Sequence, residues 1–481
     1  MQNTKPHAAL LSSPGLGHFI PVIELGKRLV TNHGFSVTVF VVTTDNSLSK
    51  SQLLKQSPCP DLLNIVLLPP VDVSGLITPA TGILSQLAIM MREALPKLRS
   101  AIVAMIFCPT VLIVDLFGIE AMVIAEEFNM LKYAFITSTA WFLALTLHMP
   151  TIDKVIEDNH VKNQQALLIP GCKSLEFGDT FEPILDRNDQ MYIEYKRMGV
   201  DLQKFDGILV NTWQDLEGTT LVALEDGKKS GRVAQVPVFP VGPLVRAVKP
   251  AGPKSEMLEW LDMQPTESVI YVSFGSGGTL SAKQTTELAC GLESSGQRFI
   301  WVVRPPIEND SAATVFKTNH RTDDTPDFLP DGFLTRTRKI GVVVPMWAPQ
   351  TEILSHPSVG GFVSHCGWNS TLESIVNGVP MIAWPLYAEQ GMNAAMLSED
   401  IGVAIRSKSF PARELVVREE IETMVRTIMD EGDARRARVK TLKSSAEKAL
   451  SKAGSSYNSL AQVANDCESA FKYLKAKAQG A

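Results

Sequence analysis

The chain has 481 residues, of which 45% are hydrophobic and 20% are charged; these are globular values that exclude a disordered, collagenous or coiled-coil chain. Lysine and arginine total 45 against 51 for aspartate and glutamate, and the net charge of −6 argues against nucleic acid or an anionic membrane surface as partner. The six cysteines form neither a CxxC pair nor a Cys/His cluster, and the N-terminal sequence has no signal-peptide pattern, so we expect a cytoplasmic protein with no disulfide framework, metal site or membrane anchor.

Short buried strands alternate with helical stretches through the first half of the chain. The predicted strands are apolar and rich in β-branched residues, and they cover residues 8–12, 36–43, 111–115, 133–136 and 208–211. Helices are predicted at 21–30, with Pro21 in the first turn, and at 120–128. Because such alternation is typical of parallel βαβ units, the pattern predicts an α/β domain over residues 1–244.

A segment rich in Pro, Gly and Lys, residues 245–256, has the composition of a linker. The α/β pattern then restarts with predicted strands at 269–274 and 299–303, separated by a glycine-rich turn at 275–278 and a capping box at 281–284. Residues 305–327 are predicted to be a surface loop, and 434–475 to be helical with an interruption at Gly454. We therefore expect a second domain over 257–455 and a terminal helix over 456–481.

The strongest motif is the block 347–390, WAPQTEILSHPSVGGFVSHCGWNSTLESIVNGVPMIAWPLYAEQ. A short strand over 362–364 leads through HCGWNS into a predicted helix at 371–377, which places His365, Asn369 and Ser370 at a helix N-terminus that favours phosphate. Glu373 lies one turn further on, where it can accept from two ribose hydroxyls, and Trp347 can stack on a base. Taken alone, the pattern is equally compatible with a strand–turn–helix whose tryptophans, Trp347 and Trp368, belong to the core.

This block resembles the plant secondary product glycosyltransferase box of the UDP-dependent family 1 glycosyltransferases. The box positions are matched throughout, at Trp347 to Gln350, Ile353, Leu354, His356, Gly360, Phe362, His365 to Ser370, Glu373, Gly378 to Pro380, Pro385, Glu389 and Gln390. The likeness extends over nearly the whole chain. Within the family, the segments 114–118, 168–172, 272–284 and 385–390 resemble the hydroxycinnamyl alcohol and hydroquinone glucosyltransferases.

The resemblance implies a role for each matched box position. The uracil would meet Trp347 and the Ala348 backbone, the ribose Gln350 and Glu373, the diphosphate His365, Asn369 and Ser370, and the sugar Trp368, Glu389 and Gln390. The family often has Gln at the last position in glucose users and His in some galactose users. Gln390 therefore favours UDP-glucose, because an inverted C4 hydroxyl would leave a polar group unpaired.

A second candidate site lies at SSPGLGHFIP, residues 12–21, directly after the first predicted strand. The segment is not a GxGxxG fingerprint, because Ile20 occupies the last glycine position. His18 and Asp115 both follow or end parallel strands, at the sheet edge where such folds bind ligands. A histidine backed by a carboxylate acts as a general base, and the resemblance implies that this pair deprotonates the acceptor hydroxyl. The alternatives are a structural histidine and an aspartate that caps a turn.

Weaker candidates complete the predicted site. Ser276, in the glycine-rich turn, either helps to cradle the α-phosphate or belongs to a packing turn. The resemblance places Thr139 near the sugar and phosphate. Large residues that either line an apolar acceptor pocket or belong to the core are Leu116, Phe117, Trp141, His148 and Met149.

The resemblance implies the GT-B fold, an α/β arrangement of two facing Rossmann-like domains with parallel sheets, whose C-terminal helix crosses back to the N-terminal domain. It also implies an inverting O-glucosyltransferase, in which a small phenol such as a monolignol or hydroquinone receives glucose from UDP-glucose as a β-glucoside. Flavonoid, stilbene or other specialised-metabolite acceptors remain alternatives. No Asp-x-Asp occurs, so we expect no metal or cofactor, with the helix N-terminus and His365 neutralising the leaving UDP. We expect a monomer.

Two other classes of protein stay open at this point. One is a non-catalytic UDP-sugar-binding protein, which the presence of both His18 and Asp115 disfavours. The other is an NAD-dependent oxidoreductase, whose ribose-binding acid at the end of the second predicted strand would be Asp45.

Overall fold

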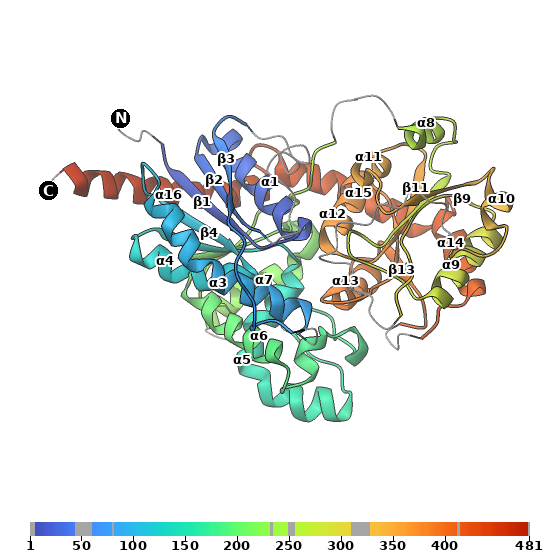
Figure 1. Cartoon of the computed structure of the whole chain (residues 1–481), viewed down its shortest axis with the longest axis horizontal. Helices are drawn as coiled ribbons and strands as arrows, with labels where there is room; N and C mark the ends of the chain where they lie inside the picture. Colours follow the sequence, from blue (N-terminus) through green and yellow to red (C-terminus); the bar gives the residue numbers. More distant parts are fainter. Residues whose placement is uncertain are drawn as a thin grey trace.

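The structure is a computed structural model that describes residues 5–43, 60–78, 81–230, 234–248, 255–308, 328–410 and 414–479. Two parallel sheets lie side by side, each with helices on its faces (Figure 1). We call residues up to 248 the N-terminal half and residues from 255 the C-terminal half. This is the GT-B arrangement that the sequence predicts, and each half is a Rossmann-like α/β unit.

The sheet of the N-terminal half has seven parallel strands in the order β3-β2-β1-β4-β5-β6-β7. Their bounds are β1 His7–Ser12, β2 Ser36–Val42, β3 Leu63–Leu68, β4 Val111–Asp115, β5 Leu131–Ile136, β6 Gly207–Val210 and β7 Val238–Pro240. Strand β1 pairs with both β2 and β4, so the strand order reverses there. Such a switch point opens a crevice at the carboxyl ends of the strands, and it brings the residues after β1 beside the end of β4.

Helices cover both faces of this sheet. They are α1 Leu16–His33, α3 Ile83–Val103, the 3₁₀ segment η1 Leu116–Ala121, α4 Met122–Glu127, α5 Ala140–Val155, the π-helical η2 Ile156–Val161, the 3₁₀ segments η3 Phe177–Asp179 and η4 Glu182–Leu185, α6 Gln190–Asp201, η5 Leu202–Lys204 and α7 Gln214–Ser230. Helix α5 is buried on almost every side, which matches its apolar sequence AWFLALTLHM. It therefore lies inside the half, with α6 and α7 packed against it.

The sheet of the C-terminal half has six parallel strands in the order β10-β9-β8-β11-β12-β13. Their bounds are β8 Val269–Ser273, β9 Arg298–Val303, β10 Gly341–Pro345, β11 Val359–Ser364, β12 Met381–Ala383 and β13 Ala404–Arg406. The accompanying helices are α8 Glu256–Asp262, α9 Ala282–Ser295, α10 Phe333–Thr337, α11 Gln350–Leu354, α12 Trp368–Asn377, α13 Gln390–Ala395, η6 Met396–Asp400, α14 Arg418–Met429 and α15 Ala434–Leu450. The switch point lies at β8, between β9 and β11, so the residues after β8 and β11 share one edge.

The last helix, α16 (Ser455–Gln479), returns to the N-terminal half and lies along it in red in Figure 1. Helix α15 ends at Leu450, and residues 451–454 separate it from α16, close to the predicted interruption at Gly454. The apolar face of α16, including Leu460, Val463 and Cys467, is buried in the same core as β1, β2 and α1. The chain therefore uses its C-terminal residues to complete the core of its N-terminal half.

Several predicted boundaries are wrong. Helix α1 begins at Leu16 rather than at 21, so Pro21 lies inside the helix and not in its first turn. Helix α12 begins at Trp368 rather than at 371, and residue 256, expected in the linker, begins α8. The strands without a sequence prediction are β3, β7, β10, β12 and β13; β7, β12 and β13 have only three residues each. Most of the predicted loop 305–327 lies outside the described residues, as does Asp45.

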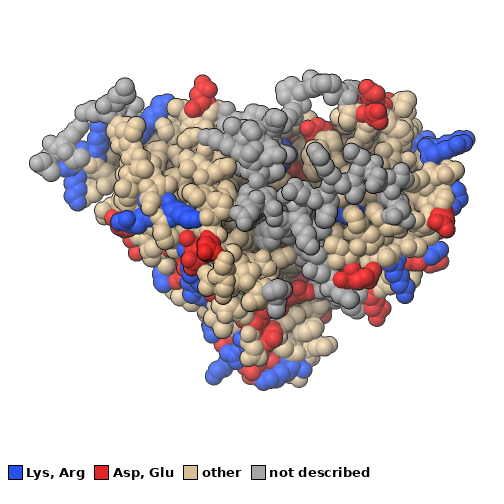
Figure 2. Space-filling model, viewed as in Figure 1, with Lys and Arg blue, Asp and Glu red and all other residues tan. Residues whose placement is uncertain are grey.

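Three further observations on the described residues bear on function. None of the helices in the described part of the chain is long and apolar enough to cross a membrane. The described residues contain no group of three or more His, Cys, Asp or Glu side chains arranged to hold a metal ion. On the face shown in Figure 2, positive and negative side chains are interspersed rather than gathered by sign.

Candidate active site

His18 and Asp115 meet at the switch point of the N-terminal sheet. Gly15, in a left-handed conformation with φ of 99°, begins α1 and puts His18 in its first turn, while Asp115 is the last residue of β4. His18 Nδ1 lies 3.3 Å from Asp115 Oδ2, without the alignment of a good hydrogen bond. Such catalytic contacts often tighten only when substrate binds. The His18 side chain is 23% exposed and that of Asp115 is fully buried, so a ligand can reach the imidazole but not the carboxylate.

Ser13, which the sequence analysis did not single out, holds the Asp115 carboxylate in place. Its backbone N–H donates to Oδ2 (2.7 Å) and its hydroxyl donates to Oδ1 (2.6 Å). The Gly118 N–H donates to Oδ1 as well (3.2 Å), since Asp115 is also the N-cap of η1. Three donors to one carboxylate fix its orientation toward His18. The only signal in the sequence is that Ser13 directly follows β1 at the ligand-binding edge.

The electrostatics around His18 suit a base. Burial lowers the pKa of His18, but Asp115, through its contact with Nδ1 and its charge, together with the charge of Glu389, outweighs this effect and raises the pKa above its usual value. Glu389 belongs to the C-terminal half, so both halves act on this imidazole. Phe117 packs edge-on against His18, with ring centroids 5.4 Å apart, and restricts its rotation.

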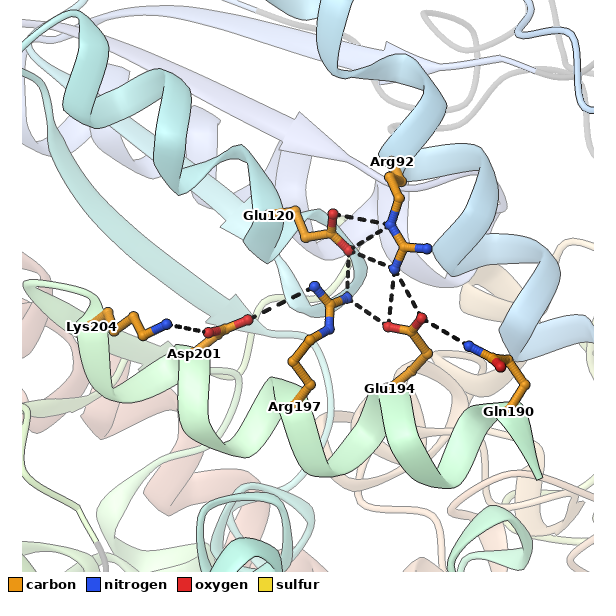
Figure 3. A network of polar contacts seen from close by, with 7 residues as sticks. All are labelled: Arg92, Glu120, Gln190, Glu194, Arg197, Asp201 and Lys204. Atoms are coloured by element: carbon orange, nitrogen blue, oxygen red, sulfur yellow. Dashed lines mark hydrogen bonds and ion pairs between the residues drawn. The ribbon is translucent and has the colours of Figure 1, made fainter. Parts of the chain in front are cut away.

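A network of ion pairs anchors the segment that follows Asp115 (Figure 3). Glu120 in η1 accepts from Arg92 Nε of α3 (3.0 Å) and also contacts Arg197 of α6. Glu194 of α6 accepts from Arg92 (2.9 Å) and from Arg197 (2.6 Å). Burial raises the pKa of both carboxyls, but the two arginines outweigh it and keep both pKa values below the usual range. The network ties η1, and with it Asp115 and Phe117, to two long helices.

The acceptor-pocket candidates occupy three different environments. Leu116 and Phe117 adjoin Asp115 directly and are almost fully buried beside the base. Trp141 and Met149 are at most 2% exposed and belong to the core around α5, so they do not line an open pocket. His148 pairs with Thr151 on the same helix (3.0 Å). Trp141 and Met149 are buried because α5 is enclosed on nearly all sides, as its uniformly apolar sequence already indicates.

Thr139 is the N-cap of α5. It is fully buried, and its hydroxyl oxygen accepts from the Phe142 N–H (3.0 Å), so the hydroxyl serves the helix start; its place near the sugar and phosphate stays a prediction. The next two amides of α5, of Ala140 and Trp141, donate to the buried carboxylate of Glu217 (3.0 Å each). Burial raises the pKa of Glu217 to about 7. The N-terminus of α5 is thus occupied by the protein itself and is not an open anion site.

The N-terminus of α12 is built differently. Gly367 is its N-cap and supplies no side-chain hydrogen bond, whereas α5 and α9 are capped by Thr139 and Ser281. The first N–H groups of α12 therefore lack the partner that a capping side chain gives. Together with the helix dipole, these groups form a site that favours a phosphate, as the sequence predicts.

His365 packs closely against two glycines beside this helix end. A Cβ atom at Gly275 would lie 2.6 Å from His365 Cε1, and one at Gly367 would overlap His365 Nε2. Burial, and then the positive charge of Arg304, lower the pKa of His365 to about 4. In the unliganded protein at neutral pH the His365 ring is therefore neutral, and its part in neutralising the leaving UDP stays a prediction. Its buried Nδ1 has no partner among the described residues, so the ring is suited to hydrogen bonding.

Arg304 is a further residue that the sequence analysis missed. It directly follows β9, and its guanidinium donates to the Met346 carbonyl (3.0 Å). Met346 has a φ of 62° and precedes Trp347, whose ring is 57% exposed and presents a flat apolar surface. Ala348 is buried, and its carbonyl accepts from the Gln350 N–H (2.8 Å). Arg304 thus supports the turn that presents the predicted base-stacking ring.

The predicted ribose residues lie together. Gln350 Nε2 donates to Glu373 Oε2 (2.7 Å) and to Ser370 Oγ (2.9 Å). Burial raises the pKa of Glu373, while the hydrogen bond from Gln350 acts in the opposite direction. The Ser370 hydroxyl, which accepts from Gln350, still has its proton to donate. Ser276 is exposed in the turn after β8, next to Gly275.

Glu389 and Gln390 lie at the start of α13. The side-chain oxygen of Gln390 accepts from the backbone N–H groups of Leu386 (2.9 Å) and Tyr387 (3.1 Å), and the buried side chain also interacts with the Tyr387 hydroxyl. Glu389 Oε1 accepts from the Ser138 hydroxyl of the N-terminal half (3.0 Å). Both residues are therefore held by protein partners before any sugar is present.

Trp368 and Asn369 join the two halves. The Trp368 indole N–H donates to the Asn211 carbonyl (2.8 Å) and the ring is buried, so its contact with the sugar stays a prediction that this side chain's hydrogen bond does not carry. Asn369 Nδ2 donates to the Gly17 carbonyl (3.0 Å). Gly17 lies four residues before Pro21, and because proline has no N–H, the carbonyl that would normally pair within α1 is open to Asn369. The first turns of α1 and α12 therefore face each other, with His18 on one of them.

Known proteins match this chain along almost its full length. The family model described as UDP-glucoronosyl and UDP-glucosyl transferase matches residues 237–437. An anthocyanidin 3-O-glucosyltransferase from Manihot esculenta is 52% identical over 472 residues, covering 98% of this chain and 97% of the relative. A hydroquinone glucosyltransferase from Rauvolfia serpentina is 43% identical, covering 96% and 98%.

The chain belongs to the plant family 1 UDP-glycosyltransferases. Its fold is shared by a glycosyltransferase of Phytolacca americana solved with UDP-2-fluoro-glucose and pterostilbene, with a TM-score of 0.84 and 37% identity over 96% of this chain and 100% of that one. As a member of this family, the present chain therefore uses a UDP-sugar donor and a small-molecule acceptor. Family membership removes the oxidoreductase alternative.

Proposed function

We propose that this glycosyltransferase moves glucose from UDP-glucose to the hydroxyl of a small phenol, such as a monolignol or hydroquinone, with inversion to a β-glucoside. One observation carries the proposal. His18, backed by Asp115, lies on the first turn of α1, which Asn369 links directly to the first turn of α12. A diphosphate on α12 would thus have its sugar next to a base, as in-line displacement requires.

The proposed reaction is a single displacement. The acceptor oxygen attacks the anomeric carbon as its proton passes to His18 Nε2, the nitrogen that faces away from Asp115. The bond between that carbon and the β-phosphate oxygen breaks, and its electrons leave with UDP. A phenol has a pKa of about 10, so a neutral imidazole can assist when proton transfer accompanies attack.

The leaving group needs stabilisation that the chain can supply itself. The uncapped N–H groups of α12, the Ser370 hydroxyl and the neutral His365 ring are all suited to donate hydrogen bonds to phosphate oxygens. We therefore propose that transfer needs no metal ion or organic cofactor.

Two features support the choice of donor and acceptor. The side-chain oxygen of Gln390 is committed to the backbone, so toward the sugar this residue can only donate, through its NH₂ group, to a hydroxyl of fixed orientation. The relatives are named for hydroquinone and anthocyanidin, and the structural relative was solved with a stilbene, pterostilbene. We favour small phenols because of the segment likeness to the hydroquinone and hydroxycinnamyl alcohol enzymes, with flavonoids and stilbenes as the second candidates.

The test is UDP release from UDP-glucose, with product mass, across coniferyl alcohol, hydroquinone, a flavonol, a stilbene and a triterpenoid alcohol. We expect gain of one anhydrohexose on the two small phenols, and an anomeric proton coupling typical of a β-glucoside. Turnover confined to the flavonol, stilbene or triterpenoid would overturn the acceptor. An α-linked product would overturn the inverting mechanism.

Donor choice has its own test. Gln390→His should raise the ratio of UDP-galactose to UDP-glucose turnover, because a ring replaces the NH₂ group that faces the sugar. Equal ratios in the wild type and the variant would remove residue 390 from recognition of the C4 hydroxyl.

A further inference from the structure

Ser138 reaches across from the N-terminal half to a donor-site carboxylate. It lies two residues past β5, at the carboxyl edge of the sheet, and is 7% exposed. Its hydroxyl donates to Glu389 Oε1 at 3.0 Å. Ser138 lies outside the box 347–390, and neither composition nor motif pointed to it.

The chain on each side of this hydrogen bond is held firmly. On the Ser138 side, Thr139 caps α5 and Glu217 takes the next two amides. On the Glu389 side, Gln390 binds the backbone of Leu386 and Tyr387. A bond between two fixed segments selects one rotamer of a flexible glutamate, and it commits one carboxylate oxygen while Oε2 stays directed elsewhere.

The position of Glu389 relative to the base gives this rotamer a consequence. The charge of Glu389 helps to raise the pKa of His18, so this carboxylate acts on the imidazole that faces the anomeric carbon in the proposed reaction. This carboxylate can accept hydrogen bonds from hexose hydroxyls. The uracil and ribose are instead predicted to contact Trp347, Gln350 and Glu373, at the other end of the site.

We propose that Ser138 is a positioning residue for the donor hexose: by orienting Glu389, it makes recognition of the sugar depend on both halves, whereas recognition of UDP depends on the C-terminal half. This inference rests on the proposed function, since it takes the transferred group to be a hexose with hydroxyls in reach of Glu389. The residue forms no covalent bond and moves no proton in the reaction.

The experiment compares binding of UDP and of UDP-glucose by calorimetry, and steady-state kinetics, for the wild type, Ser138→Ala and Ser138→Thr. We expect Ser138→Ala to leave the Kd of UDP within about twofold and to weaken UDP-glucose about tenfold, the usual cost of losing a hydrogen bond to a charged group. Ser138→Thr keeps the hydroxyl and should restore most of the loss. Equal weakening of both ligands, or of neither, would overturn the inference.

A double-mutant cycle separates this role from general destabilisation. In a Glu389→Gln background, Ser138→Ala should change UDP-glucose affinity by less than about twofold, because the oriented charge is already gone. A full tenfold effect in that background would show that Ser138 acts by another route. Failure of the wild type to turn over UDP-glucose would instead contradict the proposed function, and it is measured before any variant is made.

Discussion

Residues 347–390 bring the predicted donor contacts within one stretch of chain, whereas the base site takes Ser13, His18 and Asp115 from segments about a hundred residues apart. In the donor region the backbone and the glycines form much of the site: α12 has no capping side chain, and the His365 ring packs against Gly275 and Gly367. In the base region the site is formed by side chains that pair with one another. A contiguous motif can therefore be read from sequence, but the partners of a dispersed site depend on strand order.

The largest effect should follow from His18→Ala. Removing the base should lower kcat for alcohols and phenols by about a hundredfold to ten-thousandfold, the range that general base catalysis contributes. The affinity for UDP should stay unchanged, because the residues predicted to hold UDP lie in the other half. Calorimetry with UDP and a coupled UDP-release assay measure the two properties separately. Wild-type turnover in the variant would remove His18 from the mechanism.

Asp115→Asn should have the next largest effect and a distinctive pH signature. Asp115 raises the pKa of His18, so replacing the carboxylate lowers that pKa. Because the base must be neutral, the acidic limb of kcat/KM should move to lower pH, while the maximum falls about a hundredfold through misorientation of the ring. A thermal melt provides the control for folding, since the amide NH₂ would face the donors of Ser13. An acidic limb that stays in place would show that His18 is not the titrating group.

The donor region can be disturbed through a single methyl group. Gly275→Ala puts a Cβ 2.6 Å from the buried His365 ring, which must then shift from its place beside Gly367. We expect UDP affinity to fall about tenfold through displacement of one hydrogen-bond donor. Gly296→Ala is the matched control, because Gly296 has a similar positive φ of 67° but no atom within 4 Å of the added carbon. Equal UDP affinity in the two variants would mean that the position of the His365 ring does not contribute to UDP binding.

The smallest effect concerns the link between the two regions. Pro21→Ala supplies α1 with the missing N–H, which would compete with Asn369 for the Gly17 carbonyl. We expect kcat/KM to fall by about threefold to fivefold while the melting temperature does not decrease, since proline inside a helix is unfavourable. Pro150→Ala, a proline inside the buried helix α5, tests whether any helix proline would do the same. A melting temperature that falls in parallel with activity would indicate a purely structural role for Pro21.

The sequence was most informative where burial is complete. The strands predicted at 8–12, 36–43 and 269–274 are found within a residue of these bounds, because burial of both faces produces unbroken apolar runs. β10 was not predicted; it is only partly buried at the sheet edge, and β12 and β13 have three residues each. Pro21 was misinterpreted because proline is common at helix starts, and only the structure shows that its missing N–H serves a contact with Asn369.

Side-chain roles were harder to predict than positions. Trp368 stands in the box as expected, but its indole N–H binds the Asn211 carbonyl, a partner in the other half that no local pattern indicates. His365 is where the motif puts it, yet its charge depends on burial and on Arg304, which follows a different strand. Ser13, Ser138 and Glu217 carry no motif at all. Their importance comes from the residues that tertiary structure brings beside them.

The return of α16 to the N-terminal half has a consequence for synthesis. Ribosomes release residues 5–248 first, yet Leu460, Val463 and Cys467 fill part of the core around β1 and α1. During translation the N-terminal half must therefore wait, with that apolar surface uncovered, until more than two hundred further residues have emerged. For the same reason, a chimera that exchanges acceptor halves between two relatives should exchange residues 455–479 together with them. A chimera made without that exchange would pack the α16 helix of one enzyme against the N-terminal core of the other.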